Sequence, residues 1–525
     1  MIAFDLQAIQ SIGNSERGIA RYVTEIARHL VAGPFGERID LFLWNDRLPW
    51  TDRLADLGVG DRLRSFADVA GLDVDVLHVN SPFEVPNSID QFPPVRSRRV
   101  VTTCYDLIPY LFPDRYLSDR YASGAYRRRL ALIATSDAVV TDSRSAADDV
   151  IEQLGVDPRR VHVIGAGVSP AFRPPTAPLA DRIAALRREW PGLRARYVLV
   201  PTAADWRKNS IGAIDAFAGL PAAVRDRHQL VLFCRLTDHQ RAELEAAADA
   251  AGVGSQVLFT GYVPDDLLIA LYQSAELVFV PTIYEGFGLP VLEARRCGAR
   301  VICSDTSSLP EVLVDVDARF NPFVPGEVVA ALHRALVDDV HIAALSRIPD
   351  PGFGWDLAVE RLVAVYDGLL DDLDALPTPD RADGRLRIGV VGAMFPADEA
   401  DVVGLRDDVI APLAADDRFD VTAYSVIHPR GALFGSASPV RSFPELADDW
   451  ESRRIDAVIY VYGSTPHRLL LAANHAMPGH AVILPGAAPA VAPDRLLSVV
   501  RFDDEESPID ALTSALIGRP VAAST

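Results

Sequence analysis

Short runs of apolar, mostly β-branched residues alternate with longer helix-like stretches through most of this sequence. This alternation is typical of parallel sheets that helices cover on both faces, so we expect an α/β protein. In the first part of the chain the predicted strands are Ile2 to Leu6, Ile39 to Trp44, Val76 to Val79, Val100 to Thr103, Ala138 to Thr141 and Val161 to Ile164. Further on they are Tyr197 to Pro201, Leu230 to Cys234, Val257 to Thr260, Leu277 to Val280 and Val301 to Ser304, and then Arg387 to Gly392, Phe419 to Ser425, Ala457 to Val461 and Ala481 to Leu484.

Two linkers divide this pattern into three units. Residues 170–178 are dense in proline, and residues 373–386 form a second, polar linker after a predicted helix from about Asp356 to Leu370. The sequence therefore predicts domains at residues 1–172, 179–372 and 387–525. Each is long enough for one α/β domain.

The net charge of the chain argues against some classes of protein. With 72 acidic and 51 basic residues the chain has a formal net charge of −21, which argues against a nucleic-acid-binding or broadly membrane-adsorbed protein. The cysteines Cys104, Cys234, Cys297 and Cys303 fit neither a metal motif nor a disulfide framework. No apolar run reaches the ~18 residues of a spanning helix, and the amino terminus lacks the basic region of a signal peptide. We expect a cytoplasmic protein.

The most informative stretch is PTIYEGFGLPVLEARRCG, residues 281–298. It leads from the end of a predicted buried strand through a glycine-containing turn into a helix at Pro290, where proline is tolerated. The unpaired amides at such a helix start, and the positive end of the helix dipole, favour an anion. Gly286 and Gly288 would allow the main chain to approach a ligand closely.

Two carboxylates bracket this turn. Glu293 is expected in the first helical turn, where it would accept hydrogen bonds from two vicinal hydroxyls, as a dinucleotide-binding fold does from ribose. Glu285, nearer the strand end, is placed to meet the group beyond the phosphates. The alternative for Glu293 is a carboxylate that only stabilises the helix dipole.

With these residues the sequence resembles the retaining glycosyltransferases of the GT-B class that carry E-x(7)-E, a family that includes sucrose synthases and many bacterial polysaccharide mannosyltransferases. The resemblance covers roughly residues 1–370, and its strongest parts are YEGFGLPVLEA and SDTSSLPEV, residues 304–312. It implies two Rossmann-like domains facing a cleft, followed by a third. It also implies that Glu285 binds hydroxyls of the donor sugar and that Glu293 binds the nucleotide ribose. The loop residues that would face sugar and phosphate are Gly286, Phe287, Gly288 and Leu289.

A second match is WRKN, residues 206–209. A nucleoside diphosphate leaving group gains negative charge as the glycosidic bond breaks, so fixed cations near it lower the barrier. Arg207 and Lys208 resemble the family's pair of cations with this role. Lys208 is the only lysine of the chain, which indicates a position that needs a compact ammonium; codon bias is the alternative. The family's usual glycine before this element is absent from PTAAD, residues 201–205.

The first domain supplies further family-like segments. SERGIARYV, residues 15–23, resembles a segment that lies over the donor phosphates, which places Gly18 nearest the diphosphate; Arg17 and Arg21 are weaker candidates, and a solvated helix start is the alternative. TTCYDLIPYLFP, residues 102–113, resembles V-T-x-H-D-L-I-P with Tyr105 at the histidine position. Asp106 would position the acceptor or, alternatively, cap a helix. The segment HVNSPFE, residues 78–84, is expected to line the acceptor cleft.

Two segments concentrate arginine, residues 94–99 and 120–130. They would contact a lipid-linked acceptor at the inner face of the membrane, or form a solvated helix face. The third unit resembles the acceptor-side half of another family member, with Gly463, Ser464 and His467 in a recurring turn. Because no second E-x(7)-E follows, we expect a partial, noncatalytic domain.

Together these features predict a retaining, metal-independent hexosyltransferase without a cofactor. The expected catalytic residues are Glu285, Asp106, Arg207 and Lys208. The donor would be a nucleotide diphosphate sugar, with GDP-mannose first and UDP- or dTDP-hexoses open, and the acceptor a hydroxyl of a glycan or lipid-linked molecule in cell-surface polysaccharide synthesis. The alternative is a degenerate, noncatalytic transferase that binds nucleotide sugar or assembles a complex. The oligomeric state stays open.

Overall fold

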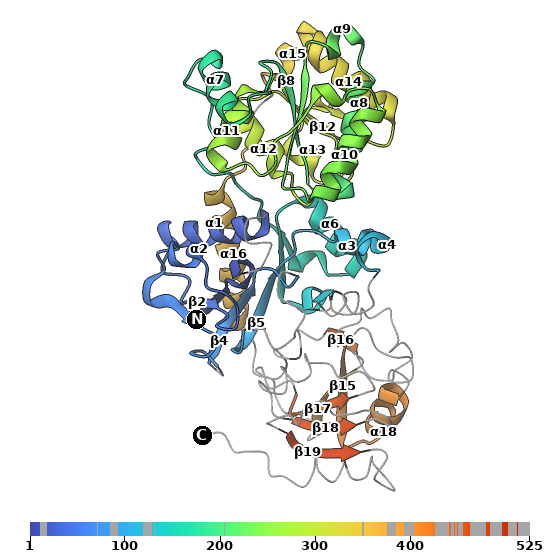
Figure 1. Cartoon of the computed structure of the whole chain (residues 1–525). Helices are drawn as coiled ribbons and strands as arrows, with labels where there is room; N and C mark the ends of the chain where they lie inside the picture. Colours follow the sequence, from blue (N-terminus) through green and yellow to red (C-terminus); the bar gives the residue numbers. More distant parts are fainter. Residues whose placement is uncertain are drawn as a thin grey trace. The chain divides into compact units, whose positions relative to one another are not determined.

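Three parallel β-sheets with flanking helices make up the described chain (Figure 1). The residues group into two compact units: unit 1 holds residues 1–140, 149–162 and 359–525, and unit 2 holds residues 141–148 and 163–358. The computed structural model describes residues 1–10, 18–70, 72–83, 93–118, 126, 129–130, 132–203, 205–348, 351–374, 385–392, 404–425, 440–442, 446, 449, 455–462, 479–483, 496–501 and 512.

The first sheet has the strand order β3-β2-β1-β4-β5-β6-β7. Its strands are β1 (Ile2–Asp5), β2 (Leu41–Trp44), β3 (Leu63–Ser65), β4 (Asp73–Val79), β5 (Arg96–Thr103), β6 (Ala138–Thr141) and β7 (Val161–Val163). The helices among these strands include α1 (Gly18–Ala32), α2 (Asp52–Ala55), α3 (Ile108–Leu111), α4 (Pro113–Tyr116) and α6 (Arg144–Leu154).

The second sheet lies in unit 2 and has the order β10-β9-β8-β11-β12-β13. Its strands are β8 (Tyr197–Pro201), β9 (Gln229–Phe233), β10 (Val257–Phe259), β11 (Leu277–Val280), β12 (Val301–Ser304) and β13 (Arg319–Phe320). The helices are α7 (Leu179–Glu189), α8 (Ser210–Ala218), α9 (Ala222–Arg225), α10 (Asp238–Ala250), α11 (Asp265–Ser274), α12 (Leu289–Arg296), α13 (Leu309–Val312), α14 (Pro325–Val337) and α15 (Asp339–Leu345). Figure 1 shows α8, α10 and α14 on one face of this sheet and α7, α11 and α12 on the other.

The central strands of the second sheet explain why the sequence folds this way. Every residue of β8, β11 and β12 is buried. A parallel strand covered by helices on both faces must be apolar along its whole length rather than at alternate positions. The runs Tyr197–Pro201 and Leu277–Val280 meet this requirement, and Val301–Ser304 meets it up to its last residue, a buried serine. All three match the predicted strands at both ends.

The third sheet has the order β16-β15-β14-β17-β18-β19. Its strands are β14 (Leu386–Val391), β15 (Phe419–Ser425), β16 (Val440–Ser442), β17 (Ala457–Tyr462), β18 (Gly479–Ile483) and β19 (Leu496–Arg501). All three sheets therefore share one topology, in which the chain starts in the middle, builds outward, and then crosses back to the other side of its first strand.

The place where the strand order reverses indicates where a ligand would bind. In open α/β sheets, ligands bind at the carboxyl ends of the strands where the strand order reverses. In the second sheet the reversal lies between the neighbours β8 and β11, which pair in parallel at Leu277 with Val198 and at Val278 with Leu199. The loops after these two strands are the ones that carry WRKN and YEGFG.

Four strands were not predicted from the sequence: β3, β13, β16 and β19. Each is at the edge of its sheet. An edge strand pairs on one side only and is partly exposed, so it needs no continuous apolar run. β13, for example, consists of Arg319 and Phe320 alone.

The predicted helix near residue 356 is α16 (Trp355–Asp374). Within unit 1, the hydroxyl of Tyr366 in this helix lies 2.5 Å from Nδ1 of His78, whose Nε2 lies 2.8 Å from the hydroxyl of Thr103. Burial lowers the pKa of His78 to about 3. The His78 ring is thus buried inside the first domain and joins α16 to the sheet. The expectation that the segment 78–84 lines an acceptor cleft stays a prediction, and Glu84 lies outside the described residues.

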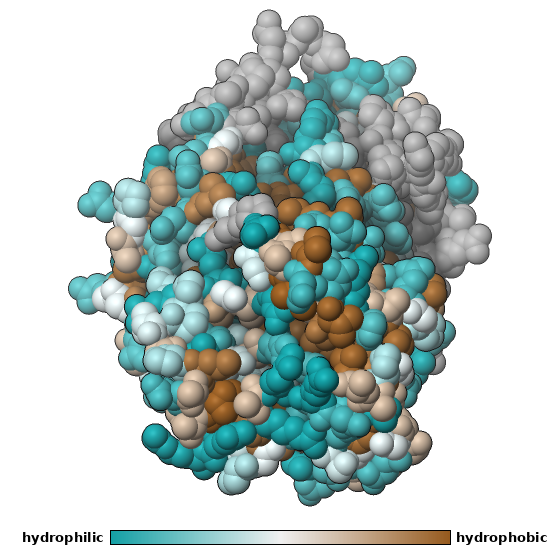
Figure 2. Space-filling view, turned by 90° about the horizontal axis from the view of Figure 1, so that it is seen from above, coloured by the Kyte–Doolittle hydropathy of each residue, from teal (hydrophilic) through white to brown (hydrophobic). Residues whose placement is uncertain are grey.

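The face of the molecule seen in Figure 2 is mixed in hydropathy. Figure 2 shows several separate groups of hydrophobic residues among hydrophilic ones, rather than one continuous apolar face. In the part of the chain that the structure describes, no helix has the length and apolar character needed to cross a membrane.

Candidate active site

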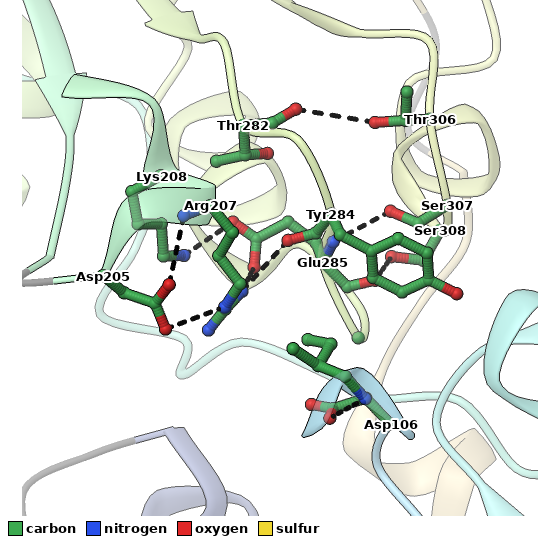
Figure 3. A network of polar contacts seen from close by, with 12 residues as sticks. Asp106, Asp205, Arg207, Lys208, Thr282, Tyr284, Glu285, Thr306, Ser307 and Ser308 are labelled. Carbon is green, nitrogen blue, oxygen red and sulfur yellow. Dashed lines mark hydrogen bonds and ion pairs between the residues drawn. The ribbon is translucent and has the colours of Figure 1, made fainter. Parts of the chain in front are cut away.

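Two cations and one carboxylate meet where the strand order of the second sheet reverses. Arg207 Nη1 donates to Glu285 Oε2 at 2.9 Å, and Lys208 Nζ donates to Glu285 Oε1 at 2.6 Å. Figure 3 shows both side chains pointing at this carboxylate from the loop after β8. The Glu285 side chain is only 8% exposed. The sequence-predicted residues Glu285, Arg207 and Lys208 are therefore brought together.

The charges of this cluster balance. Burial would raise the pKa of Glu285, but Lys208 and Arg207 lower it below the ordinary value of 4.5, so the carboxylate is ionised at neutral pH. Asp205 Oδ2 accepts a hydrogen bond from Arg207 Nε at 3.1 Å and adds a second negative charge. A carboxylate has about four lone-pair sites and an ammonium has three donors, so these ion pairs leave capacity for a ligand.

Local sequence fixes the cations. The Asp205 side chain accepts from the backbone N–H of Arg207 and caps the 3-10 helix η5 (Trp206–Lys208). Asn209 then takes a left-handed conformation, with φ of 54°, and starts α8. Short polar side chains such as Asn adopt this conformation more readily than most. The turn therefore directs two consecutive side chains toward the β11–α12 loop.

Glycine is required at the start of α12. Gly288 has φ of +99°, and a Cβ there would lie 2.7 Å from Leu309 Cδ2. Leu289 and Pro290 then begin the helix, as expected for proline in the first turn. Gly286 accepts a hydrogen bond from Ser143 Oγ at 2.6 Å, whereas Phe287 is buried and packs edge-on against Phe353.

The structure corrects the placement of Glu293. This residue is the fifth of α12, beyond the first helical turn, because the helix begins at Leu289 directly after the left-handed glycine. Glu293 is 7% exposed, and Tyr272 of α11 donates a hydrogen bond to its Oε2 at 3.3 Å. A carboxylate has about four lone-pair sites, so Glu293 can accept hydroxyls of a ligand while the Tyr272 hydroxyl keeps it oriented.

The first-domain candidates belong to unit 1. Asp106 Oδ1 accepts from the backbone N–H of Ile108 at 3.0 Å in the turn before α3, whose N-cap residue is Leu107 rather than Asp106. Tyr105 is buried and packs edge-on against Tyr22. Gly18 is the exposed first residue of α1. Arg17, Gly463, Ser464 and His467 lie outside the described residues.

Sequence reasoning assigned no role to several residues that hold the cluster. Asp205 caps η5, and Tyr272 meets Glu293 only because α11 packs beside α12. Ser307 Oγ accepts from the Glu285 N–H at 2.9 Å, and Ser308 Oγ donates to the Glu285 carbonyl at 3.1 Å. Both serines lie inside SDTSSLPEV, which was singled out as a segment but not residue by residue.

The described part of the chain holds no group of three or more His, Cys, Asp or Glu side chains arranged to bind a metal ion. All four cysteines are free thiols, as expected from their spacing.

Two family models match this chain. Residues 188–339, which include the second sheet and the cluster above, match "Glycosyl transferases group 1". Residues 17–172, which hold most of the first sheet, match "Glycosyltransferase Family 4".

Similar curated proteins are named glycosyltransferases or mannosyltransferases. A serotype-specific mannosyltransferase WbdA of Escherichia coli is 34% identical over 333 residues, covering 61% of this chain and 40% of the relative. An O-antigen chain mannosyltransferase B of E. coli is 26% identical over 349 residues, covering 61% of this chain and 87% of that protein. A D-inositol 3-phosphate glycosyltransferase of Xylanimonas cellulosilytica is 33% identical over 249 residues, 45% of this chain and 58% of that protein. The chain spans only 32 to 40% of the length of the WbdA proteins.

Solved structures share the fold. Sucrose-phosphate synthase of Thermosynechococcus elongatus superposes with a TM-score of 0.52 at 18% identity, covering 71% of this chain and 99% of that one. HepE of Anabaena, solved with UDP and glucose, gives 0.51 at 17% identity, with coverage of 71% and 99%. At these identities the likeness shows the fold alone, and the prediction of an α/β GT-B fold with a third sheet is confirmed.

Proposed function

Because residues 188–339 match the model of glycosyl transferases group 1 and residues 17–172 match that of Glycosyltransferase Family 4, we propose that this chain is a retaining hexosyltransferase with a nucleotide diphosphate sugar as donor. Mannose is the proposed sugar and GDP-mannose the first donor to test, because several similar proteins of Escherichia coli are named mannosyltransferases. The proposed acceptor is a hydroxyl of a glycan or lipid-linked molecule in cell-surface polysaccharide synthesis.

The observation that carries the proposal is the ion-paired cluster of Arg207, Lys208 and Glu285 at the strand-order reversal. A diphosphate bound beside it would add negative charge next to two cations that the protein already holds in place. Fixed cations stabilise the charge that develops on the leaving group without reorganising during the reaction. Arg207 and Lys208 would thus assist departure of the nucleotide, with no metal ion needed for that step.

The two carboxylates have different proposed partners. Glu285 uses one oxygen for each cation, so its remaining lone pairs would accept hydroxyls of the donor sugar. Glu293, inside α12 and bonded to Tyr272, would accept the ribose hydroxyls. The main chain around Gly286, Phe287, Gly288 and Leu289 would face the phosphates, at the amino-terminal end of α12. Gly18 and Asp106 remain proposed contacts of diphosphate and acceptor, and no step is assigned to the third sheet.

The test is a panel of nucleotide sugars, screened first by thermal shift and then by nucleotide release. We expect GDP-mannose to raise the unfolding temperature and to yield GDP when acceptor is present, with the anomeric configuration retained in the product. Glu285→Gln should reduce turnover by a factor of about 100 or more. Arg241→Ala, which removes an exposed arginine paired with Glu245, is the matched control. Binding without any nucleotide release would favour a noncatalytic partner protein instead.

A further inference from the structure

Two residues beside the cluster have a backbone conformation that residues other than glycine rarely adopt. Asn209 has φ of 54° and Ser307 has φ of 48°, and no other non-glycine residue among those described has a positive φ. Such conformations are unfavourable, less so for Asn than for Ser, and they persist where the surroundings impose them. Because both residues bond the segment Pro281–Glu285, they affect the position of Glu285.

Both residues bond the loop that carries Glu285. Asn209 Nδ2 donates to the carbonyl of Pro281 at 3.0 Å, at the beginning of the loop. Ser307 Oγ accepts from the N–H of Glu285 at 2.9 Å, at its end (Figure 3). The two strained residues therefore hold the segment Pro281–Glu285 from the neighbouring loops after β8 and β12.

Other bonds complete this support. The N–H of Ile283 donates to the Arg207 carbonyl at 2.7 Å, and Arg207 Nη1 donates to the Tyr284 carbonyl at 3.0 Å. Ser308 Oγ donates to the Glu285 carbonyl at 3.1 Å. Bonds from the loops after β8 and β12 thus hold this backbone from both sides.

A helical glycine gives independent support. Gly212 lies inside α8, where alanine would be the better helix former. A Cβ at Gly212 would lie 2.4 Å from Asn209 Oδ1 and 2.6 Å from Asn209 Nδ2. The missing side chain therefore leaves the space that the Asn209 amide occupies while it bonds Pro281.

We propose that Asn209 and Ser307 are positioning residues that hold the Pro281–Glu285 backbone, so that Glu285 meets Arg207 and Lys208 before the donor binds. The proposal rests on the proposed function for its kinetic consequence, but its geometric part is testable without turnover. Neither residue needs to touch the donor.

The test uses the full chain with Asn209→Gly, Ser307→Gly and Gly212→Ala. The two glycine variants relieve the positive φ while removing the bond, so their unfolding temperatures should stay within about 3 °C of the wild type. Gly212→Ala keeps Asn209 but displaces its amide. The matched control is Gly326→Ala in α14, where a Cβ would meet nothing within 4 Å.

The first readout is the rate at which an amine-acetylating reagent modifies Lys208, measured by peptide mass mapping. Lys208 is the only lysine in the chain, so its modified peptide is unambiguous. We expect each test variant to react about fivefold faster or more, because its ammonium is less firmly bonded to Glu285. In a Glu285→Gln background Asn209→Gly should add little, since the shared partner is already lost. Wild-type acetylation rates in Asn209→Gly and Ser307→Gly would overturn the proposal.

The second readout is nucleotide release from the donor that the wild type uses. We expect kcat to fall about tenfold to a hundredfold in the three test variants and to stay unchanged in Gly326→Ala. Unchanged kcat in the glycine variants would also overturn the positioning role. If the wild type releases nucleotide from no donor of the panel, the proposed function is wrong. The acetylation rates would still show whether Asn209 and Ser307 hold the ion pair between Lys208 and Glu285.

Discussion

Lys208 Nζ donates a hydrogen bond to Glu285 Oε1 at 2.6 Å, although 77 positions separate the two residues in the chain. The contact exists because β8 and β11 are neighbours in the sheet and each ends directly before one of the two loops. Arg207 binds the other oxygen of the same carboxylate. One glutamate thus orients two consecutive cations.

Lys208→Arg should lower turnover by a factor of about ten or more although it conserves the charge. A planar guanidinium cannot replace a compact ammonium where Arg207 already occupies the other Glu285 oxygen. Lys208→Ala should be worse, by a factor of about 100 to 1,000. Initial rates of nucleotide release measure both, with Arg241→Ala as the surface control; equal rates for Lys208→Arg and the wild type would contradict the assignment.

Tyr272→Phe should weaken nucleotide binding while leaving kcat nearly unchanged. The change removes the hydroxyl that bonds Glu293 Oε2, and the loss should cost about 1 kcal/mol of stability. Tyr197→Phe is the matched control, because the Tyr197 hydroxyl is also buried but donates to the Leu271 carbonyl at 2.7 Å. Calorimetric titration with GDP compares the two variants, and equal affinity losses would argue against Glu293 as a ribose ligand.

Gly288→Ala should destabilise the second domain more than Gly261→Ala does. Both glycines have positive φ, but a Cβ at Gly261 meets nothing within 4 Å, whereas one at Gly288 overlaps the Leu309 side chain. The backbone penalty of about 1 to 2 kcal/mol applies to both. The overlap adds about 1 to 3 kcal/mol at Gly288 alone. Urea unfolding of the two variants measures this difference, which would vanish if the α12 turn repacked freely.

Asp5→Asn should remove a pH dependence of stability. Burial raises the pKa of Asp5 from 3.8 to about 7, so between these values the folded state binds a proton that the unfolded state releases. Stability from this group is present below pH 4 and is lost as the pH rises to about 7, at about 1.4 kcal/mol per pH unit.

Unfolding free energies of wild type and Asp5→Asn at pH 5, 6, 7 and 8 test this effect. The comparison cancels other groups, such as Asp137, whose pKa burial raises to about 6, and His78, which has the opposite sign. We expect the variant to gain stability relative to the wild type as pH rises. A difference that does not change with pH would show that the Asp5 carboxyl is not held in its neutral form.

Removal of divalent metal should leave turnover unchanged. The proposed mechanism neutralises the leaving diphosphate with Arg207 and Lys208, so EDTA-treated protein should release nucleotide at the wild-type rate, and added Mg²⁺ or Mn²⁺ should change it less than about twofold. If chelation abolishes activity and one of these ions restores it, a metal ion rather than Arg207 and Lys208 neutralises the leaving diphosphate.

The sequence by itself determined the sheet-and-helix alternation, the central strands and the loops that form the candidate site. Continuous apolar runs such as Tyr197–Pro201 can be satisfied only by burial on both faces, and that requirement is visible residue by residue. The edge strand β13 was not predicted, because a strand that pairs on one side only needs no continuous apolar run. Similarly, the YEGFG segment with Gly288 and Pro290 marked a helix start, although it placed Glu293 one turn too early.

Only the tertiary structure decided which side chains meet. Glu285 was expected to face a sugar and Lys208 a diphosphate, but their bond to each other follows from the adjacency of β8 and β11. Tyr272 reaches Glu293 through the packing of α11 on α12, and Ser307 reaches the Glu285 amide across two neighbouring loops. Local pattern specifies strands and turns because their causes are local; pairings between distant loops depend on strand order, which a single sequence does not display.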